Sequence, residues 1–171
     1  MAGLLKTAFP PIVADGARLL ILGSMPGEAS LRLGQYYGHA RNAFWPIIGA
    51  LLEFPPDANY ASRIAALTAN GIALWDVIAT CARRGSLDSA IEPDSVRVND
   101  FDALFAAYPG IRCIAFNGGT AEREYQRRVF PALPVLYRHI ERIRLPSTSP
   151  AHAGMALDAK LAAWRVLLDR L

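Results

Sequence analysis

The feature that most constrains the fold is a set of short, nearly continuous apolar runs at residues 18–22, 72–78 and 111–116. Strands of a parallel sheet have this composition when helices bury both faces of the sheet. Shorter strand candidates lie at 135–137 and 140–145. The runs therefore predict a buried, mainly parallel sheet.

Helical patterns alternate with these runs, at 43–53, 60–69, 100–107 and 120–129. The last helix is expected to bury one apolar stripe. That stripe consists of Leu157, Leu161, Trp164, Leu168 and Leu171. Alternating strands and helices favour a layered α/β fold, and 171 residues suit one domain, 1–171.

Composition excludes several classes of protein. Hydrophobic residues make up 53% and charged residues 19%, which is typical of a globular chain. No apolar run has the length of a membrane span, and residues 1–11 are too weak a pattern for a secretory signal. Cys81 and Cys113 lie on separate expected strands, so neither a disulfide framework nor a four-ligand metal site is expected. We expect a cytoplasmic protein.

Charge points weakly toward a polyanionic partner. The net charge is +3, and many soluble proteins are equally basic. Most of the arginines, including Arg83, are interpreted as solvated surface residues.

The unusual segments all follow strand ends, where open parallel sheets bind ligands. Residues 23–27 read GSMPG, Asp76 ends the second run, Asn117 follows the third and 145–150 read LPSTSP. GSMPG offers backbone N–H groups to an anion or a base edge, although alone it is equally an ordinary turn. It lacks the Gly-Lys-Ser/Thr ending of a phosphate-binding loop.

Residues 35–45 read QYYGHARNAFW, which combines aromatic, amide and cationic groups suited to an extruded base. Asn42 is equally suited to cap the following helix. His39 is either a phosphate contact or a structural histidine. Residues 145–154 form a stiff turn before the last helix, and Thr120 is the expected cap of its own helix.

In this order, the segments GSMPG, QYYGHARNAFW, LWDVIATCARRGSLDS and LPSTSPA resemble the uracil-DNA glycosylase superfamily, most closely its hypoxanthine-DNA glycosylase branch. The resemblance spans residues 19–164. It implies a three-layer α/β/α sandwich around a short, mainly parallel sheet. It also implies cleavage of a base–sugar bond in base excision repair, without metal or other cofactor.

The resemblance also implies roles for individual residues. Met25 stands where relatives hold a water-positioning Asp or Asn, and Ser147 stands where many hold a histidine. The catalytic load then falls on Asn42, whose amide oxygen would hold water, with Ser147 stabilising the departing base. Tyr37 would stack on the base. Asp76 replaces the asparagine that reads uracil in many relatives, which argues against a dedicated uracil pocket.

The remaining expected contacts to the base and to DNA surround Asn42 and Ser147. Gly23, Ser24, Met25 and Pro26 would border the base, together with Tyr37 and Asp76. His39, Ser149, His152 and Met155 would contact DNA. His152 and Met155 lie in the segment that would fill the space left by the flipped base. Met155 is nearly as well explained as the start of the core stripe of the last helix.

The sequence therefore predicts a monomeric, monofunctional glycosylase that acts on DNA containing a deaminated base, hypoxanthine first. The alternatives are a uracil- or mismatch-specific glycosylase, a non-catalytic binder of damaged DNA, and a small nucleotide-binding α/β protein.

Overall fold

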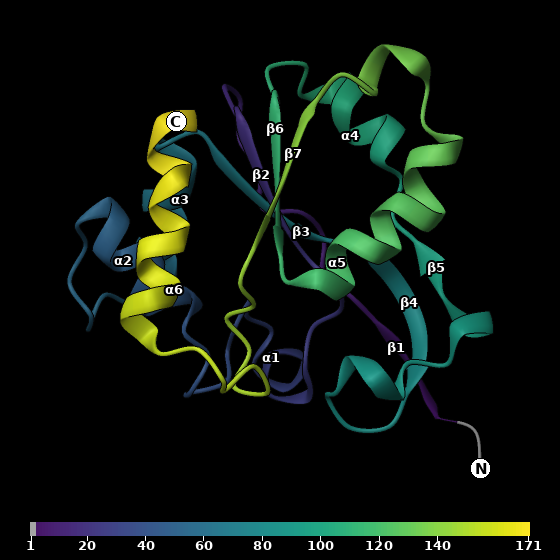
Figure 1. Cartoon of the computed structure of the whole chain (residues 1–171), viewed down its shortest axis with the longest axis horizontal. Helices are drawn as coiled ribbons and strands as arrows, with labels where there is room; N and C mark the ends of the chain where they lie inside the picture. The colour runs from purple at the N-terminus through teal and green to yellow at the C-terminus, as the bar shows by residue number, and fades with distance from the viewer. Residues whose placement is uncertain (1–2) are drawn as a thin grey trace.

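A four-stranded parallel sheet forms the centre of the computed structural model, which describes residues 3–171 (Figure 1). In spatial order the strands are β3 (Ile72–Asp76), β2 (Leu19–Gly23), β6 (Cys113–Asn117) and β7 (Glu141–Leu145). The register places Gly23 opposite Asp76 and Asn117 opposite Leu145, so the carboxyl ends of the strands meet at one edge.

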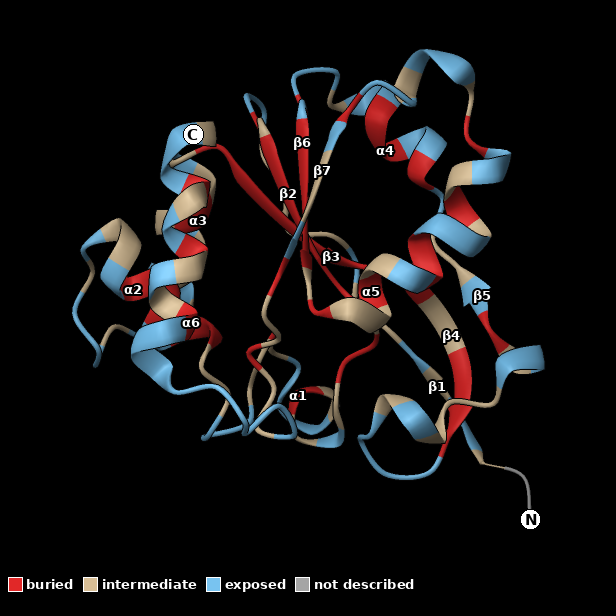
Figure 2. Cartoon of the chain, viewed as in Figure 1, coloured by how far each residue is buried: buried red, intermediate tan, exposed pale blue. Residues whose placement is uncertain are grey.

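Helices cover both faces of this sheet, which confirms the expected three-layer α/β/α sandwich (Figures 1 and 2). Alternate residues of a strand point to opposite faces. Leu19 and Ile21 accordingly belong to one hydrophobic core, and Leu20 and Leu22 to the other. The first face carries α2 (Phe44–Leu52), α3 (Tyr60–Ala69) and α6 (Leu157–Trp164), and the second carries α4 (Phe101–Ala107) and α5 (Gly119–Glu124).

A second sheet, antiparallel and three-stranded, was not predicted. It consists of β1 (Leu4–Thr7), β4 (Ile78–Arg83) and β5 (Arg97–Val98), in the order β1-β4-β5. The apolar run at 72–78 is therefore not one strand: β3 ends at Asp76 and the chain passes through Val77 into the other sheet. Because Val77 and Ile78 are as buried as β3, hydropathy does not mark the change of sheet.

Two apolar segments near the C-terminus differ from expectation. Residues Val135–Tyr137 form an exposed 3₁₀ turn and not a strand, and Val135 is 77% exposed. The last helix continues as a 3₁₀ helix at Arg165–Arg170, where fewer residues per turn change which side chains face the core. Leu167 is therefore buried, whereas Leu157 and Leu168 of the expected stripe are exposed.

The start of helix α5 and the presence of helix α1 were not predicted correctly from the sequence. Gly118, and not Thr120, precedes α5, and no side chain caps that helix. The short helix α1 (Glu28–Leu33) follows the GSMPG loop and was not predicted. The remaining turns are 3₁₀ helices at Asp88–Ala90, Pro93–Ser95 and Phe130–Ala132, and a π-helical turn at Tyr125–Val129. Within residues 3–171, no helix has both the length and the apolar character to cross a membrane.

Candidate active site

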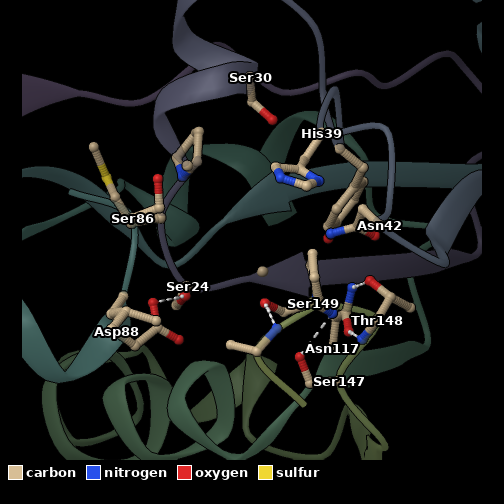
Figure 3. Close-up of a pocket in the computed structure, with 18 of the residues that line it drawn as sticks. Ser24, Ser30, His39, Asn42, Ser86, Asp88, Asn117, Ser147, Thr148 and Ser149 are labelled. Atoms are coloured by element: carbon tan, nitrogen blue, oxygen red, sulfur yellow. Dashed lines mark hydrogen bonds between the residues drawn. The ribbon is translucent and has the colours of Figure 1, made fainter. Parts of the chain in front are cut away.

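A cavity of about 540 Å³ opens at the carboxyl ends of the parallel strands (Figure 3). The structure brings nearly all the sequence-predicted site residues to it. The predicted residues on its lining are Gly23, Ser24, Met25, Pro26, Tyr37, His39, Asn42, Asp76, Ser147, Ser149 and His152. Met155 is the one predicted residue that lies outside it.

The cavity holds two buried polar atoms without a well-formed hydrogen bond. Asp76 Oδ2 makes no hydrogen bond within the described chain, and Tyr37 Oη has Asn117 nearby as a polar partner, without good hydrogen-bond geometry. Both side chains crowd Gly23: a Cβ on that residue would lie 2.6 Å from Asp76 Oδ1 and 3.1 Å from Tyr37 Oη. Unpaired buried polar atoms are costly, so these two are suited to a polar ligand.

Asp76 is poised between its two protonation states. Burial raises the pKa of this carboxyl to about 7, the negative charge of Asp88 raises it further and Arg83 offsets part of the shift. Near neutral pH the group therefore accepts a hydrogen bond when ionised and also donates one when protonated.

Tyr37 holds its ring in a constrained position. Its backbone lies in the left-handed region, at φ 54°. The ring stacks on Phe44 with centroids 3.9 Å apart and planes inclined by 22°. Because Phe44 covers one face of the ring, a flipped base can stack only on the other.

Asn42 makes the hydrogen bond that the capping interpretation requires. Its Oδ1 accepts the Phe44 N–H at 2.9 Å, although Ala43 occupies the N-cap position of α2. This bond orients the amide, with the oxygen toward the start of the helix and Nδ2 left to donate. Because an amide oxygen has two lone pairs, Oδ1 can still accept a second hydrogen bond.

Asn117 joins two of the loops and was not among the predicted site residues. Its Oδ1 accepts the Thr148 N–H, and its Nδ2 donates to Thr148 Oγ1, both at 2.9 Å. Thr148 in turn accepts the Ala43 N–H at its carbonyl oxygen. The signal in the sequence was the place of Asn117 at the end of a buried strand.

Ser147 and Ser149 form successive turns beside this link. The Ser147 oxygen accepts the Ser149 N–H, and the Ser149 oxygen accepts the Ala151 N–H, both at 3.2 Å. Each hydroxyl hydrogen is therefore available to donate. Gly118 allows the close approach, because a Cβ there would lie 2.9 Å from Ser147 Cβ.

The opposite side of the cavity is charged, and the sequence did not reveal it. Ser24 Oγ donates to Asp88 Oδ1 at 2.8 Å. Arg83 lies behind them with its side chain fully buried, which corrects its interpretation as a solvated residue. Met25 does not contribute polar chemistry, because its side chain belongs to a core cluster with Ile78, Cys81 and Val96.

Residues 151–159 form an exposed rim beside the cavity (Figure 2). Met155 is 36% exposed, so it does not begin the core of the last helix. His152 lines the cavity, and its carbonyl oxygen accepts a hydrogen bond from the buried Lys160 amine at 2.8 Å. His39 lies on the lining with its Nδ1 accepting the Arg41 N–H.

The described residues contain no group of three His, Cys, Asp or Glu side chains placed to hold a metal ion. Both cysteines are buried and unpaired, on β4 and β6.

Comparison with known proteins identifies the family. A model of the uracil DNA glycosylase superfamily matches residues 10–168. A hypoxanthine DNA glycosylase of Methanosarcina barkeri is 40% identical over 114 residues, which are 66% of this chain and 71% of that protein. The protein of that name from Methanosarcina acetivorans is 40% identical over 119 residues, covering 69% and 74%.

A solved structure agrees with these matches. A solution NMR structure from Methanosarcina acetivorans, proposed to be a uracil DNA glycosylase, has a TM-score of 0.76 and 34% identity, covering 96% of this chain and 99% of that one. The chain therefore belongs to the uracil DNA glycosylase superfamily. It is a DNA glycosylase, an enzyme of DNA repair.

Proposed function

We propose that this glycosylase removes hypoxanthine from DNA and leaves an abasic site. The observation that carries the proposal is Asp76, a buried carboxyl with one unpartnered oxygen, on the lining of a cavity of about 540 Å³. The ionised carboxyl accepts the ring N–H that deamination gives to the base, whereas adenine offers an acceptor at that position. The names of the two Methanosarcina relatives support the same substrate.

The reaction requires that the base leave the duplex, because the glycosidic bond is out of reach inside the stack. In the cavity, Tyr37 stacks on the base. The bond between the sugar and the base then breaks with its electron pair going to the base, and water adds to the anomeric carbon.

Asn42 and Ser147 assist the departure of the base. Asn42 Nδ2 and the Ser147 hydroxyl donate hydrogen bonds to the negative charge that develops on it. Donors fixed in advance are effective because they need no reorganisation as the charge appears. The bond from Phe44 N–H to Asn42 Oδ1 and the bond from Ser149 N–H to Ser147 Oγ provide this fixation.

The enzyme is proposed to be monofunctional. A bifunctional enzyme cleaves the strand through a Schiff base, which needs an amine at the sugar. Among the described residues that line the cavity there is no lysine. Water is thus the nucleophile in this scheme.

The test is incubation with oligonucleotides that contain inosine, xanthine or uracil, in EDTA, followed by alkaline cleavage of abasic sites. We expect inosine to be cut fastest, with no strand cleavage before alkali. Faster cutting of uracil would overturn the hypoxanthine assignment. Tight binding without cleavage would show a non-catalytic binder, and activity restored by one specific metal would overturn the metal-free mechanism.

A further inference from the structure

The GSMPG loop contains no residue that can take a proton from the attacking water. Water that attacks the sugar must be held and must lose a proton. Met25 is buried against Ile78 and Cys81, and the amide of Asn42, whose Oδ1 accepts the Phe44 N–H, cannot take a proton from water. A carboxylate elsewhere on the cavity lining is therefore of interest.

Asp88 supplies such a carboxylate from a different part of the chain. It is the first residue of the turn Asp88–Ala90, which follows β4, and it lines the base cavity and an adjoining polar cavity of about 420 Å³. Its side chain is 38% exposed. Figure 3 shows Asp88 and Ser24 on one side of the cavity and Asn42 on the other.

Two residues hold this carboxylate in place. Ser24, next to Met25 in the GSMPG loop, donates its hydroxyl to Asp88 Oδ1 at 2.8 Å. Arg83 places Nη1 4.0 Å from the same oxygen and donates from Nη2 to the Pro26 carbonyl oxygen. Because its Nε and Nη1 have no hydrogen-bond partner within the described chain, the nearby Asp88 charge compensates a fully buried guanidinium.

We propose that Asp88 is a catalytic residue that orients the attacking water and accepts its proton, and that Ser24 and Arg83 are positioning residues. This inference rests on the proposed function. The water oxygen forms the new bond to the anomeric carbon, the base leaves with the electron pair of the broken bond, and the water proton passes to Asp88. The proton then returns to solvent.

The surroundings of Asp88 make its carboxylate a stronger base than an exposed one. Burial raises the pKa of Asp88, while the hydrogen bond from Ser24, the charges of Arg83 and Arg123 and a hydrogen bond from Thr120 lower it. Asp76 lies close enough that the Asp88 charge raises its pKa, and His152 shares the adjoining cavity. A carboxylate with a raised pKa is a stronger base while it remains ionised.

The first experiment is single-turnover cleavage of an inosine-containing duplex by Asp88→Asn, beside binding of an uncleavable analogue. The asparagine keeps the shape and an acceptor for Ser24 but is not a base. We expect the rate to fall about a hundredfold, the lower range for loss of a general base, without weaker binding. The matched control is Asp94→Asn, an exposed carboxylate of the next turn, and it should retain the wild-type rate.

The second experiment tests whether Ser24 positions the Asp88 carboxylate or only stabilises the loop. Because Asp76 also titrates, the pH–rate profiles are compared in proteins that carry Asp76→Asn, which keeps an acceptor oxygen but does not titrate. In that background Ser24→Ala removes the hydrogen bond that favours the ionised Asp88 carboxylate, so the acid limb of the profile should move to higher pH. A full wild-type rate in Asp88→Asn, or an unmoved limb in Ser24→Ala, would overturn this inference while the proposed function stands. Wild-type protein that cuts no damaged base would instead overturn the proposed function, and this inference with it.

Discussion

The two sides of the cavity are built from different chemistry. One side is charged, with Asp88 held by Ser24 and backed by the buried Arg83. The other is neutral, with amide and hydroxyl groups from Asn42 and from the link between Asn117 and Thr148. The difference teaches that a single cavity can present a carboxylate on one side and hydrogen-bond donors on the other.

The two sides also differ in how the fold makes them. The neutral side comes from loops after strands of the parallel sheet, tied together by bonds between side chains and backbone. The charged side exists because the chain leaves β3 and enters the antiparallel sheet before it returns at Asp88. Substitutions on each side should therefore have separable effects.

The largest effect should come from Asn42 on the neutral side. Asn42→Ala should lower the single-turnover rate about a hundredfold, as loss of one preorganised donor does. Asn42→Ser should be nearly as slow, because serine can accept the Phe44 N–H but has no amide donor. Full activity in the serine variant would show that Asn42 only caps the helix. Thermal melting of both variants measures the capping contribution, about 1 kcal/mol.

The next effect concerns Asp76, which lies between the two sides. Its pKa is about 7 in the folded protein against an ordinary 3.8, so folding favours the protonated form. Stability from this group is fully present below about pH 4 and is lost as pH rises through 7. Asp76→Asn should therefore be more stable than wild type at pH 8, by on the order of 2 kcal/mol, and not at pH 4. Denaturant unfolding at both pH values measures this, and an equal difference at both would contradict it.

A smaller effect is expected for Tyr37, whose ring faces the base in the proposed complex. Stacking of a base on an aromatic ring contributes roughly 1–3 kcal/mol. We expect the lower half of that range, because Phe44 still lies behind the ring position. Tyr37→Ala should weaken binding to inosine-containing duplex, and Tyr37→Phe should not. Equal weakening on undamaged duplex would show that the ring does not contact the flipped base.

The smallest effect should come from the exposed rim outside both sides. Extrusion costs a few kcal/mol in a duplex and less in a single strand. His152→Ala and Met155→Ala should therefore slow cleavage of duplex inosine by only a few-fold and leave single-stranded inosine unchanged. The measurement is the ratio of the cleavage rate of duplex inosine to that of single-stranded inosine, for each variant and for wild type. If both substrates slow equally, the rim does not fill the space left by the base.

The sequence predicted the parallel sheet because β2 and β6 are buried on both faces and therefore consist of continuous apolar residues. On the neutral side it predicted Asn42 through the family resemblance, and it placed Asn117 at a strand end without predicting that this residue holds Thr148. It did not predict Arg83 or Asp88. Their segment has the composition of a surface loop, and its place at the cavity depends on pairing between β1 and β4, which are distant in sequence.

Gly23 has a consequence for how this protein can evolve. A Cβ there would lie 2.6 Å from Asp76 Oδ1, so the carboxyl must shift before any side chain fits. A lineage that acquires alanine at 23 must therefore also shorten or turn the residue at 76, whereas asparagine can replace Asp76 with Gly23 unchanged because the two side chains have the same shape. The dependence runs in one direction, so a side chain at 23 should be accompanied by a smaller or turned residue at 76.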